Sequence, residues 1–217
     1  MSYKISVDTG GTFTDVIVSD ESGNENIGKA LTTPNRIFDG MRNALKSAAF
    51  DRDISLEELL SAGKLLIYGT TRATNAIITE SVAKTAFITT KGFPDTLVVK
   101  EGGKYNPHDF SSDFPTPYIA RHNTFELEER IDSLGNQVLP FNYNQALDLC
   151  KEINRRGFKA VAVCFLWSIA NSDHEKEMAR ILSDNLPDLP YTLSHELIPV
   201  VREYRRASAT AIDASLK

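Results

Sequence analysis

The fold of this chain is decided near its start, by the stretch Val7-Asp8-Thr9-Gly10-Gly11-Thr12-Phe13-Thr14-Asp15. A short apolar strand ends at Asp8, two glycines turn the chain, and a second apolar strand leaves through Phe13. Glycine has no Cβ, so a Gly-Gly turn tolerates positive φ and lets the backbone approach a ligand closely. Backbone N–H groups and hydroxyls suit phosphoryl oxygens, and a carboxylate suits hydrated Mg²⁺. On spacing alone, the stretch fits a phosphate- and magnesium-binding hairpin and an ordinary Gly-Gly hairpin with polar turn residues about equally well.

Length and composition describe a globular protein. The 217 residues are enough for one large domain or two small ones, and 41% hydrophobic with 24% charged residues exclude a disordered chain. The net charge of −5 and the lack of a long basic block argue against nucleic acid as a partner. The two cysteines, Cys150 and Cys164, form no C-x-x-C pair and are expected to be buried free thiols.

No secretory or membrane-spanning segment is expected. Residues 1–4 lead directly into a strand, without the apolar segment of a signal peptide. The longest apolar run, residues 160–167, is too short to span a bilayer. We therefore expect a cytoplasmic protein without membrane contact.

The first 91 residues predict the element order β-β-β-α-β-α-β. Three antiparallel strands followed by two helical crossovers give a mixed five-stranded sheet with helices on both faces. This is the order of the ribonuclease-H-like core that forms each lobe of the actin-like ATPases, where a phosphate hairpin beginning with Asp joins the first two strands. The predicted elements are strands over 4–7, 13–19 and 25–32, a helix over 35–49 after Pro34, a short helix capped by Ser55 and Glu58, strand 65–68, a helix over 73–78 and strand 84–89.

The rest of the chain predicts two further parts. Residues 92–123 are rich in proline and are expected to form surface loops around one short strand, Thr96 to Lys100. A second, smaller α/β portion follows up to residue 199, and a helical pattern then runs from about 200 to Lys217 without a cap. We therefore expect a lobe over 1–91, a loop-rich α/β subdomain over 92–199, and over 200–217 the start of a helix leading into a missing second lobe.

Charged side chains outside the hairpin suggest weaker sites. His108, Asp109, Asp113 and His122 match no local metal-ligand spacing, so we do not predict a metal centre there. The basic residues at the start of the last helix are expected to form a solvated face, with a phosphate or partner contact as the alternative. They are Arg202, Arg205 and Arg206.

A second candidate anion site lies at Gly69-Thr70-Thr71, where a strand passes into a helix. Free backbone N–H groups and the helix dipole stabilise a nearby negative charge by about 0.3–1 kcal/mol. Thr71 would equally serve as an ordinary N-cap. Asn75, one turn later, either reaches the same site or lies in solvent.

Several stretches together resemble the N-terminal region of the hydantoinase/oxoprolinase family, whose members include ATP-dependent hydantoinases, 5-oxoprolinases, lactam-opening relatives and the acetone and acetophenone carboxylases. The resemblance covers nearly the whole chain and is weakest over residues 102–107. The stretches that carry it are residues 7–15, Gly69-Thr70-Thr71-Arg72-Ala73-Thr74-Asn75-Ala76, Glu129-Arg130-Ile131-Asp132, Phe165-Leu166-Trp167-Ser168 with Asn171 and His174-Glu175, and Arg202-Glu203-Tyr204.

The resemblance implies an enzyme that uses ATP and Mg²⁺ to phosphorylate the oxygen of an amide, lactam or enolisable ketone, together with a second subunit or C-terminal domain. Asp8 would hold the metal through water, and Asp8, Thr12 and Asp15 would be the catalytic residues. The residues implied in nucleotide binding are Gly10, Gly11 and Thr12 at the β- and γ-phosphates, Thr14 with Asp15 orienting the loop or the attacking oxygen, and Gly69, Thr70, Thr71 and Asn75 across the cleft.

Three functions stay open at this point. The first is a hydrolase that opens a cyclic amide such as 5-oxoproline or hydantoin, the second is the ATP-using subunit of an acetone/acetophenone-type carboxylase, and the third is a non-catalytic nucleotide-binding or scaffolding lobe. The intact hairpin motif argues against the third. The chain contains no second phosphate loop, so the isolated 217 residues are expected to bind ATP feebly or not at all.

Overall fold

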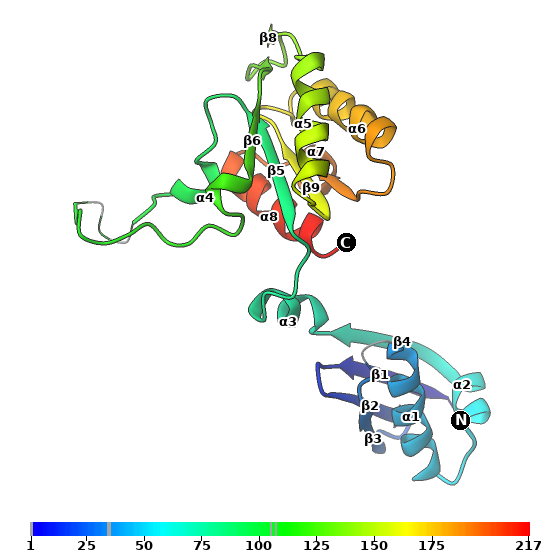
Figure 1. Ribbon diagram of the computed structural model, residues 1–217. Helices are drawn as coiled ribbons and strands as arrows, with labels where there is room; N and C mark the ends of the chain where they lie inside the picture. Colours follow the sequence, from blue (N-terminus) through cyan, green and yellow to red (C-terminus); the bar gives the residue numbers. More distant parts are fainter. Residues whose placement is uncertain (1, 34–35, 105, 107) are drawn as a thin grey trace. The chain divides into compact units, whose positions relative to one another are not determined.

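The computed structural model describes residues 2–33, 36–104, 106 and 108–217. The chain divides into two units, Met1–Ser81 and Val82–Lys217, each with its own sheet and its own core (Figure 1). Among the helices of the described residues, none has the length and apolar character needed to cross a bilayer.

The first unit is built on a four-stranded sheet with the order β3-β2-β1-β4. The strands β1 (Tyr3–Thr9), β2 (Phe13–Asp20) and β3 (Glu25–Leu31) form an antiparallel meander, and β4 (Gly63–Thr70) pairs in parallel with β1. The helices are α1 (Ile37–Phe50), α2 (Leu56–Ser61) and α3 (Arg72–Ile78).

One face of this sheet is covered by α1 and α2. Strand alternation places Ile5, Val7, Val16 and Val18 on that face, where they pack with the apolar stripe of α1. Gly28 lets the helix approach, because a Cβ at this position would lie 2.0 Å from the backbone oxygen of Ala44. The core of the unit therefore lies between the sheet and these two helices.

The predicted five-stranded sheet with helices on both faces is not what the structure shows. The strand expected as its fifth member, β5 (Thr85–Thr90), pairs with strands of the second unit, which leaves β4 as an edge strand. Within the described part of the first unit, no helix covers the other face of the sheet, which carries Lys4 and Ile17, and α3 buries none of its residues. An apolar pattern predicts that a segment is a strand but does not specify its neighbour.

The second unit has a four-stranded parallel sheet with the order β10-β9-β5-β6. Two helices pack on one of its faces and the last helix packs on the other, which gives three layers. The remaining elements are η1 (Arg121–Asn123), β6 (Thr124–Leu127), β7 (Arg130–Ile131), β8 (Gln137–Leu139), β9 (Ala160–Cys164), β10 (Tyr191–Leu193), α4 (Thr96–Val99), α5 (Tyr143–Arg155), α6 (Asp173–Asn185), α7 (Ser194–Leu197) and α8 (Glu203–Ser215).

Local sequence signals had mixed success in locating the helices. Ser55 and Glu58 form the predicted capping box at the start of α2, whereas the predicted start of the first helix at Pro34 and Asn35 lies outside the described residues. The strand predicted over Thr96 to Lys100 is wrong, since Thr96–Val99 is the single helical turn α4. Lys100 then adopts a positive φ of 57°, which prevents further helical extension.

Candidate functional site

The turn between β1 and β2 keeps the predicted hairpin residues at one end of the first unit's sheet. The N–H of Gly10 donates to the backbone oxygen of Phe13 at 2.9 Å and closes the turn. Asp8 lies opposite Asp15 in the antiparallel register of the two strands. The N–H groups of Gly11 and Thr12 donate no hydrogen bond to any described residue and are free for a ligand.

The two glycines serve the turn in a way that was not expected. Neither Gly10 nor Gly11 has a φ in the left-handed region, so conformational freedom does not explain them. A Cβ at Gly11 would lie 3.1 Å from Nδ2 of Asn75, closer than an ordinary contact. The missing side chain therefore admits Asn75 to the turn, and of the two possibilities for Asn75 the structure shows the one next to the hairpin.

The second predicted anion site lies beside the first. The parallel register of β1 and β4 places Gly69 next to Asp8 and Thr70 next to Thr9. The backbone oxygen of Thr9 accepts hydrogen bonds from the Thr70 hydroxyl at 3.0 Å and from the N–H of Thr71 at 3.3 Å. Thr71 precedes α3, but its side chain caps no helical N–H, because its hydroxyl accepts from Asn75 Nδ2 at 3.3 Å.

A cavity of about 130 Å³ opens between the two turns. Thr9 lines it and is 2% exposed, yet its hydroxyl has no hydrogen-bond partner within the described residues. Buried polar groups are almost always hydrogen-bonded, so this hydroxyl calls for a ligand or water. Arg72 also lines the cavity, and its guanidinium makes no hydrogen bond or ion pair with another described residue. The lining residues are Thr9, Gly10, Gly11, Thr32, Ile37, Arg72 and Asn75.

Sequence reasoning missed Thr9, Thr32 and Arg72. The sequence does contain a signal for Thr9. Strand alternation places it on the same buried face as Ile5 and Val7, where an apolar side chain is expected and a hydroxyl is unusual. Thr32 and Arg72 reach the cavity from segments outside the hairpin, and no spacing in the sequence signals this.

Two of the remaining hairpin residues are held by the protein itself. Thr14 is fully buried, and its hydroxyl lies 3.0 Å from that of Thr32, which also donates to the backbone oxygen of Gly10 at 3.0 Å. Asp15 accepts from Lys29 Nζ at 2.8 Å in a partly exposed ion pair. In contrast, the exposed carboxylate of Asp8 makes no hydrogen bond or ion pair with any described residue. Asp8 is therefore the carboxylate available to a cation, while Thr14 and Asp15 support the turn.

The acidic and histidine side chains of residues 108–122 form no comparable site. Asp109 accepts hydrogen bonds from the backbone N–H and the hydroxyl of Ser111. The hydrogen bond from the hydroxyl is the main reason why the pKa of Asp109 is lowered. Within the described residues, no three His, Cys, Asp or Glu side chains lie close enough together to hold a metal.

The later motifs of the chain lie largely in the core of the second unit. The buried Glu175 carboxylate accepts from the N–H of Phe165 at 2.9 Å, from the Ser194 hydroxyl at 2.6 Å and from His195 Nδ1 at 2.6 Å. Arg206, expected on a solvated face, is fully buried and donates to the backbone oxygen of Phe165 at 2.7 Å. Buried charges persist only when they are paired and hydrogen-bonded, so this network supports the fold.

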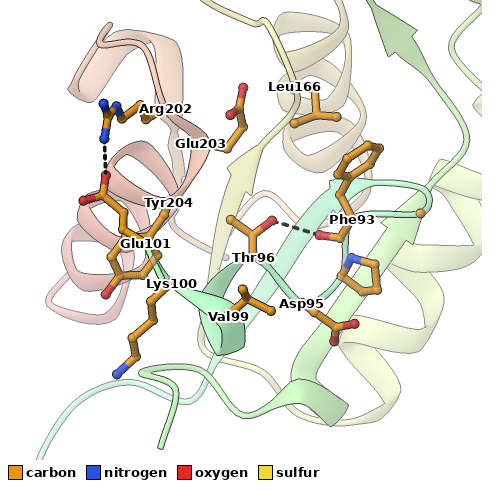
Figure 2. Close-up of a pocket in the computed structure, with 12 residues that line it drawn as sticks. Phe93, Asp95, Thr96, Val99, Lys100, Glu101, Leu166, Arg202, Glu203 and Tyr204 are labelled. Atoms are coloured by element: carbon orange, nitrogen blue, oxygen red, sulfur yellow. Dashed lines mark hydrogen bonds and ion pairs between the residues drawn. The ribbon is translucent and has the colours of Figure 1, made fainter. Parts of the chain in front are cut away.

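A second and larger pocket, of about 530 Å³, lies in the second unit. Figure 2 shows that its walls come from α4 with the residues before it, from Leu166 and from the start of α8. The Glu101 carboxylate at its rim binds Arg205 Nε at 2.8 Å and lies 3.9 Å from Arg202 Nη1. The hydrogen bond from Arg205 is the main cause that lowers the pKa of Glu101.

Comparisons with a family model and with known proteins point to the same family. The model of the hydantoinase/oxoprolinase N-terminal region matches residues 4–186. The chain is 33% identical to the caprolactamase subunit alpha of Pseudomonas jessenii, with 99% of the chain and 31% of that protein aligned. It is 29% identical to the acetophenone carboxylase gamma subunit of Aromatoleum aromaticum, with 98% of the chain and 31% of that protein aligned.

Two solved structures share the fold. The crystal structure of the ATP-dependent caprolactamase from Pseudomonas jessenii superposes with a TM-score of 0.83 at 32% identity, over 99% of this chain and 31% of that one. Nucleotide-free acetone carboxylase superposes with a TM-score of 0.88 over 98% of this chain and 32% of that one, at 22% identity, so this likeness concerns the fold alone. The chain spans about a third of the length of the caprolactamase and acetophenone carboxylase subunits.

Proposed function

This chain belongs to the hydantoinase/oxoprolinase family and matches its N-terminal region, and from this we propose that it is the phosphate-binding part of an enzyme. The enzyme would use ATP to open a cyclic amide. The chain corresponds to about a third of its relatives, so the proposal concerns the enzyme that contains it. The relative with a solved structure at 32% identity is an ATP-dependent caprolactamase, which supports this reaction class over others.

The proposal rests on one observation: Thr9 lines the cavity beside Gly10 and Gly11, and its buried hydroxyl has no hydrogen-bond partner within the described residues. A phosphoryl group supplies the acceptor oxygens that such a donor lacks. The free N–H groups of Gly11 and Thr12 and the unpaired Arg72 guanidinium are further donors at the same turn. Phosphoryl transfer depends mainly on positioning and charge neutralisation, and this set of donors suits both tasks.

In this proposal the hairpin residues have different roles. Gly11 and Thr12 bind the β- and γ-phosphates through the backbone, Thr14 holds the turn through Thr32, and Gly10 closes it. Thr70 and Thr71 hold the neighbouring turn against Thr9. Phosphorylating the amide oxygen makes the carbonyl carbon an electrophile to which water adds. The tetrahedral adduct then collapses with cleavage of the ring C–N bond and protonation of the departing amine, and hydrolysis of the resulting acyl phosphate releases phosphate and the ring-opened carboxylate.

The unpaired Asp8 carboxylate fits the role of metal ligand better than Asp15, which is paired with Lys29. Hard carboxylate oxygens are the ligands that Mg²⁺ prefers, usually with several waters retained. When bound, Mg²⁺ would neutralise negative charge on the phosphates. Asp8 then serves to hold this charge at the end of β1, from the sheet face opposite to the Thr9 side chain.

A carboxylase subunit is the second candidate function, favoured by the 29% identity to the acetophenone carboxylase gamma subunit over 98% of this chain. A product assay with the complete enzyme separates the two. Stimulation of ADP formation by 5-oxoproline, hydantoin or a larger lactam, with the ring-opened product, supports the hydrolase. ADP formation that requires both bicarbonate and a ketone contradicts it and supports the carboxylase.

A further inference from the structure

The pocket of about 530 Å³ in the second unit brings together two motifs that the phosphate site does not use. Leu166 comes from the Phe165-Leu166-Trp167-Ser168 stretch, and Arg202-Glu203-Tyr204 forms the start of α8. These segments face Phe93, Thr96 and Val99 across the pocket (Figure 2). Its volume falls within the range of about 300–1,000 Å³ that is typical of small-molecule sites.

The pocket combines apolar walls with polar groups that lack partners. Phe93, Pro94, Val99 and Leu166 supply the apolar surface. Neither the carboxylate of Glu203 nor the hydroxyl of Tyr204 makes a hydrogen bond or ion pair with another described residue, and both side chains are half-buried. A few polar groups that are free to bind a ligand, among apolar side chains, are the usual composition of a ligand site.

Other charged groups on the pocket rim are already engaged. Asp95 binds Arg121 Nε at 2.6 Å, and Glu101 binds Arg205 Nε at 2.8 Å. Glu203 is therefore the acidic residue of the pocket whose carboxylate is left for a ligand. A pocket of equal volume near residues 139–144 differs in this respect, because its carboxylate, Glu128, binds Lys91 Nζ at 2.9 Å.

The backbone around the pocket is strained. Lys100 and Arg202, which line it, have φ values of 57° and 82°, and Trp167, which follows Leu166, has a φ of 57°. Non-glycine residues rarely adopt this region, and they persist there where surrounding structure or function requires it. At Arg202 the turn lets α8 begin with Glu203, which brings Glu203 and Tyr204 to the pocket.

We propose that this pocket binds the cyclic amide. The ring N–H donates to the Glu203 carboxylate, the amide oxygen accepts from the Tyr204 hydroxyl, and the ring methylenes pack against Phe93, Val99 and Leu166. A cyclic secondary amide carries one donor and one acceptor beside an apolar ring, which matches one free acceptor and one free donor among apolar walls. The choice of a cyclic amide as the ligand rests on the proposed function. The pocket and its unpaired polar groups are observed independently of that function.

Binding to the 217-residue chain tests the assignment without ATP. Amide resonances in an ¹⁵N-labelled sample are followed while ε-caprolactam, hydantoin or 5-oxoproline is added. We expect saturable shifts for residues 92–101 and 202–204 with at least one of these ring amides. Glu203→Gln is expected to weaken binding by about tenfold, because a neutral amide oxygen replaces the charged acceptor and a hydrogen bond to a charged group is the stronger of the two. Val99→Trp, at a half-exposed position, is expected to abolish binding by filling the pocket.

The ligand itself provides the sharpest control. N-methylcaprolactam has no N–H, so it should bind more weakly than caprolactam and be unaffected by Glu203→Gln. Glu57→Gln removes a first-turn carboxylate from α2 in the other unit and should leave binding unchanged, which controls for charge and helix position. An effect of Glu203→Gln on N-methylcaprolactam equal to that on caprolactam would overturn the proposal, as would the absence of ring-amide binding or shifts confined to other residues. These results concern the second unit, so they are separate from loss of ATP turnover at the phosphate hairpin.

Discussion

The hydroxyl of Thr70 donates a 3.0 Å hydrogen bond to the backbone oxygen of Thr9, across 61 residues of sequence. This contact joins the two turns that the sequence marks as anion sites, one at the end of β1 and the other at the end of β4. The same Thr70 hydroxyl accepts from the N–H of Arg72 at 3.2 Å and so also orders the start of α3. Thr70 therefore supports the site by linking the hairpin to the segment that carries Arg72 and Asn75.

Thr70→Val removes this link while keeping the side-chain volume. We expect the free energy of unfolding of the first unit to fall by about 1 kcal/mol, the usual net value of one such hydrogen bond. ATP turnover of the complete enzyme should fall as well, because Arg72 and Asn75 lose their alignment with the hairpin. Urea unfolding and steady-state kinetics measure the two effects. Thr70→Ser is the matched control and should retain most of both properties.

Thr9→Val should separate activity from stability. The Thr9 hydroxyl is buried without a partner, so replacing it with a methyl group removes an unsatisfied polar group at nearly constant volume. We expect the free energy of unfolding to stay constant or rise by up to about 1 kcal/mol, and ATP turnover to fall by about tenfold. A variant with normal turnover and lower stability would show that the hydroxyl has only a structural role.

Glu175→Gln should destabilise the second unit strongly. The substitution removes the charge that accepts from Phe165, Ser194 and His195, and it leaves the buried Arg206 without a nearby carboxylate in the same network. We expect a loss of about 2–4 kcal/mol in the free energy of unfolding. Glu152→Gln, in an exposed ion pair with Arg155, should cost less than about 0.5 kcal/mol. Equal losses in the two variants would contradict the importance of the buried network.

The cysteines are expected to be unreactive in the folded chain. Burial disfavours the thiolate and raises the pKa of Cys150 to about 11 and that of Cys164 to about 12. Because an unfolded thiol ionises near pH 8.5, the folded state binds more protons than the unfolded state above that pH, and these thiols favour unfolding as the pH rises further. At pH 8, alkylation by iodoacetamide should be slow in buffer and fast in urea. Rapid alkylation of the folded chain at either residue would contradict the burial described here.

Local sequence signals predicted the parts of the fold that local chemistry controls. The paired glycines identified the turn after β1, and Ser55 with Glu58 identified the start of α2. The Gly69-Thr70-Thr71 turn was predicted for the same reason, since a strand, a glycine and a helix follow one another directly. The comparison with relatives confirms the family that these motifs resemble.

Features that depend on distant segments were not predictable in the same way. The pattern of β5 indicates a buried strand, but only packing decides that its neighbours are β6 and β9 and not β4. Arg206 has the composition of a surface residue, and its burial depends on acceptors supplied by Phe165 and Ser194 from other elements. Thr32 and Arg72 likewise line the cavity only because the fold brings their distant segments to the hairpin.

Replacement of one carboxylate tests the central claim most directly. Asp8→Asn is made in the complete enzyme, and ADP formation is measured with saturating cyclic amide. Asp51→Asn, which removes an exposed carboxylate outside the site, serves as the matched control. The account predicts that Asp8→Asn abolishes ADP formation with the thermal unfolding transition unchanged, while Asp51→Asn stays near the wild-type rate. Near-normal ADP formation by the folded Asp8→Asn enzyme would contradict it.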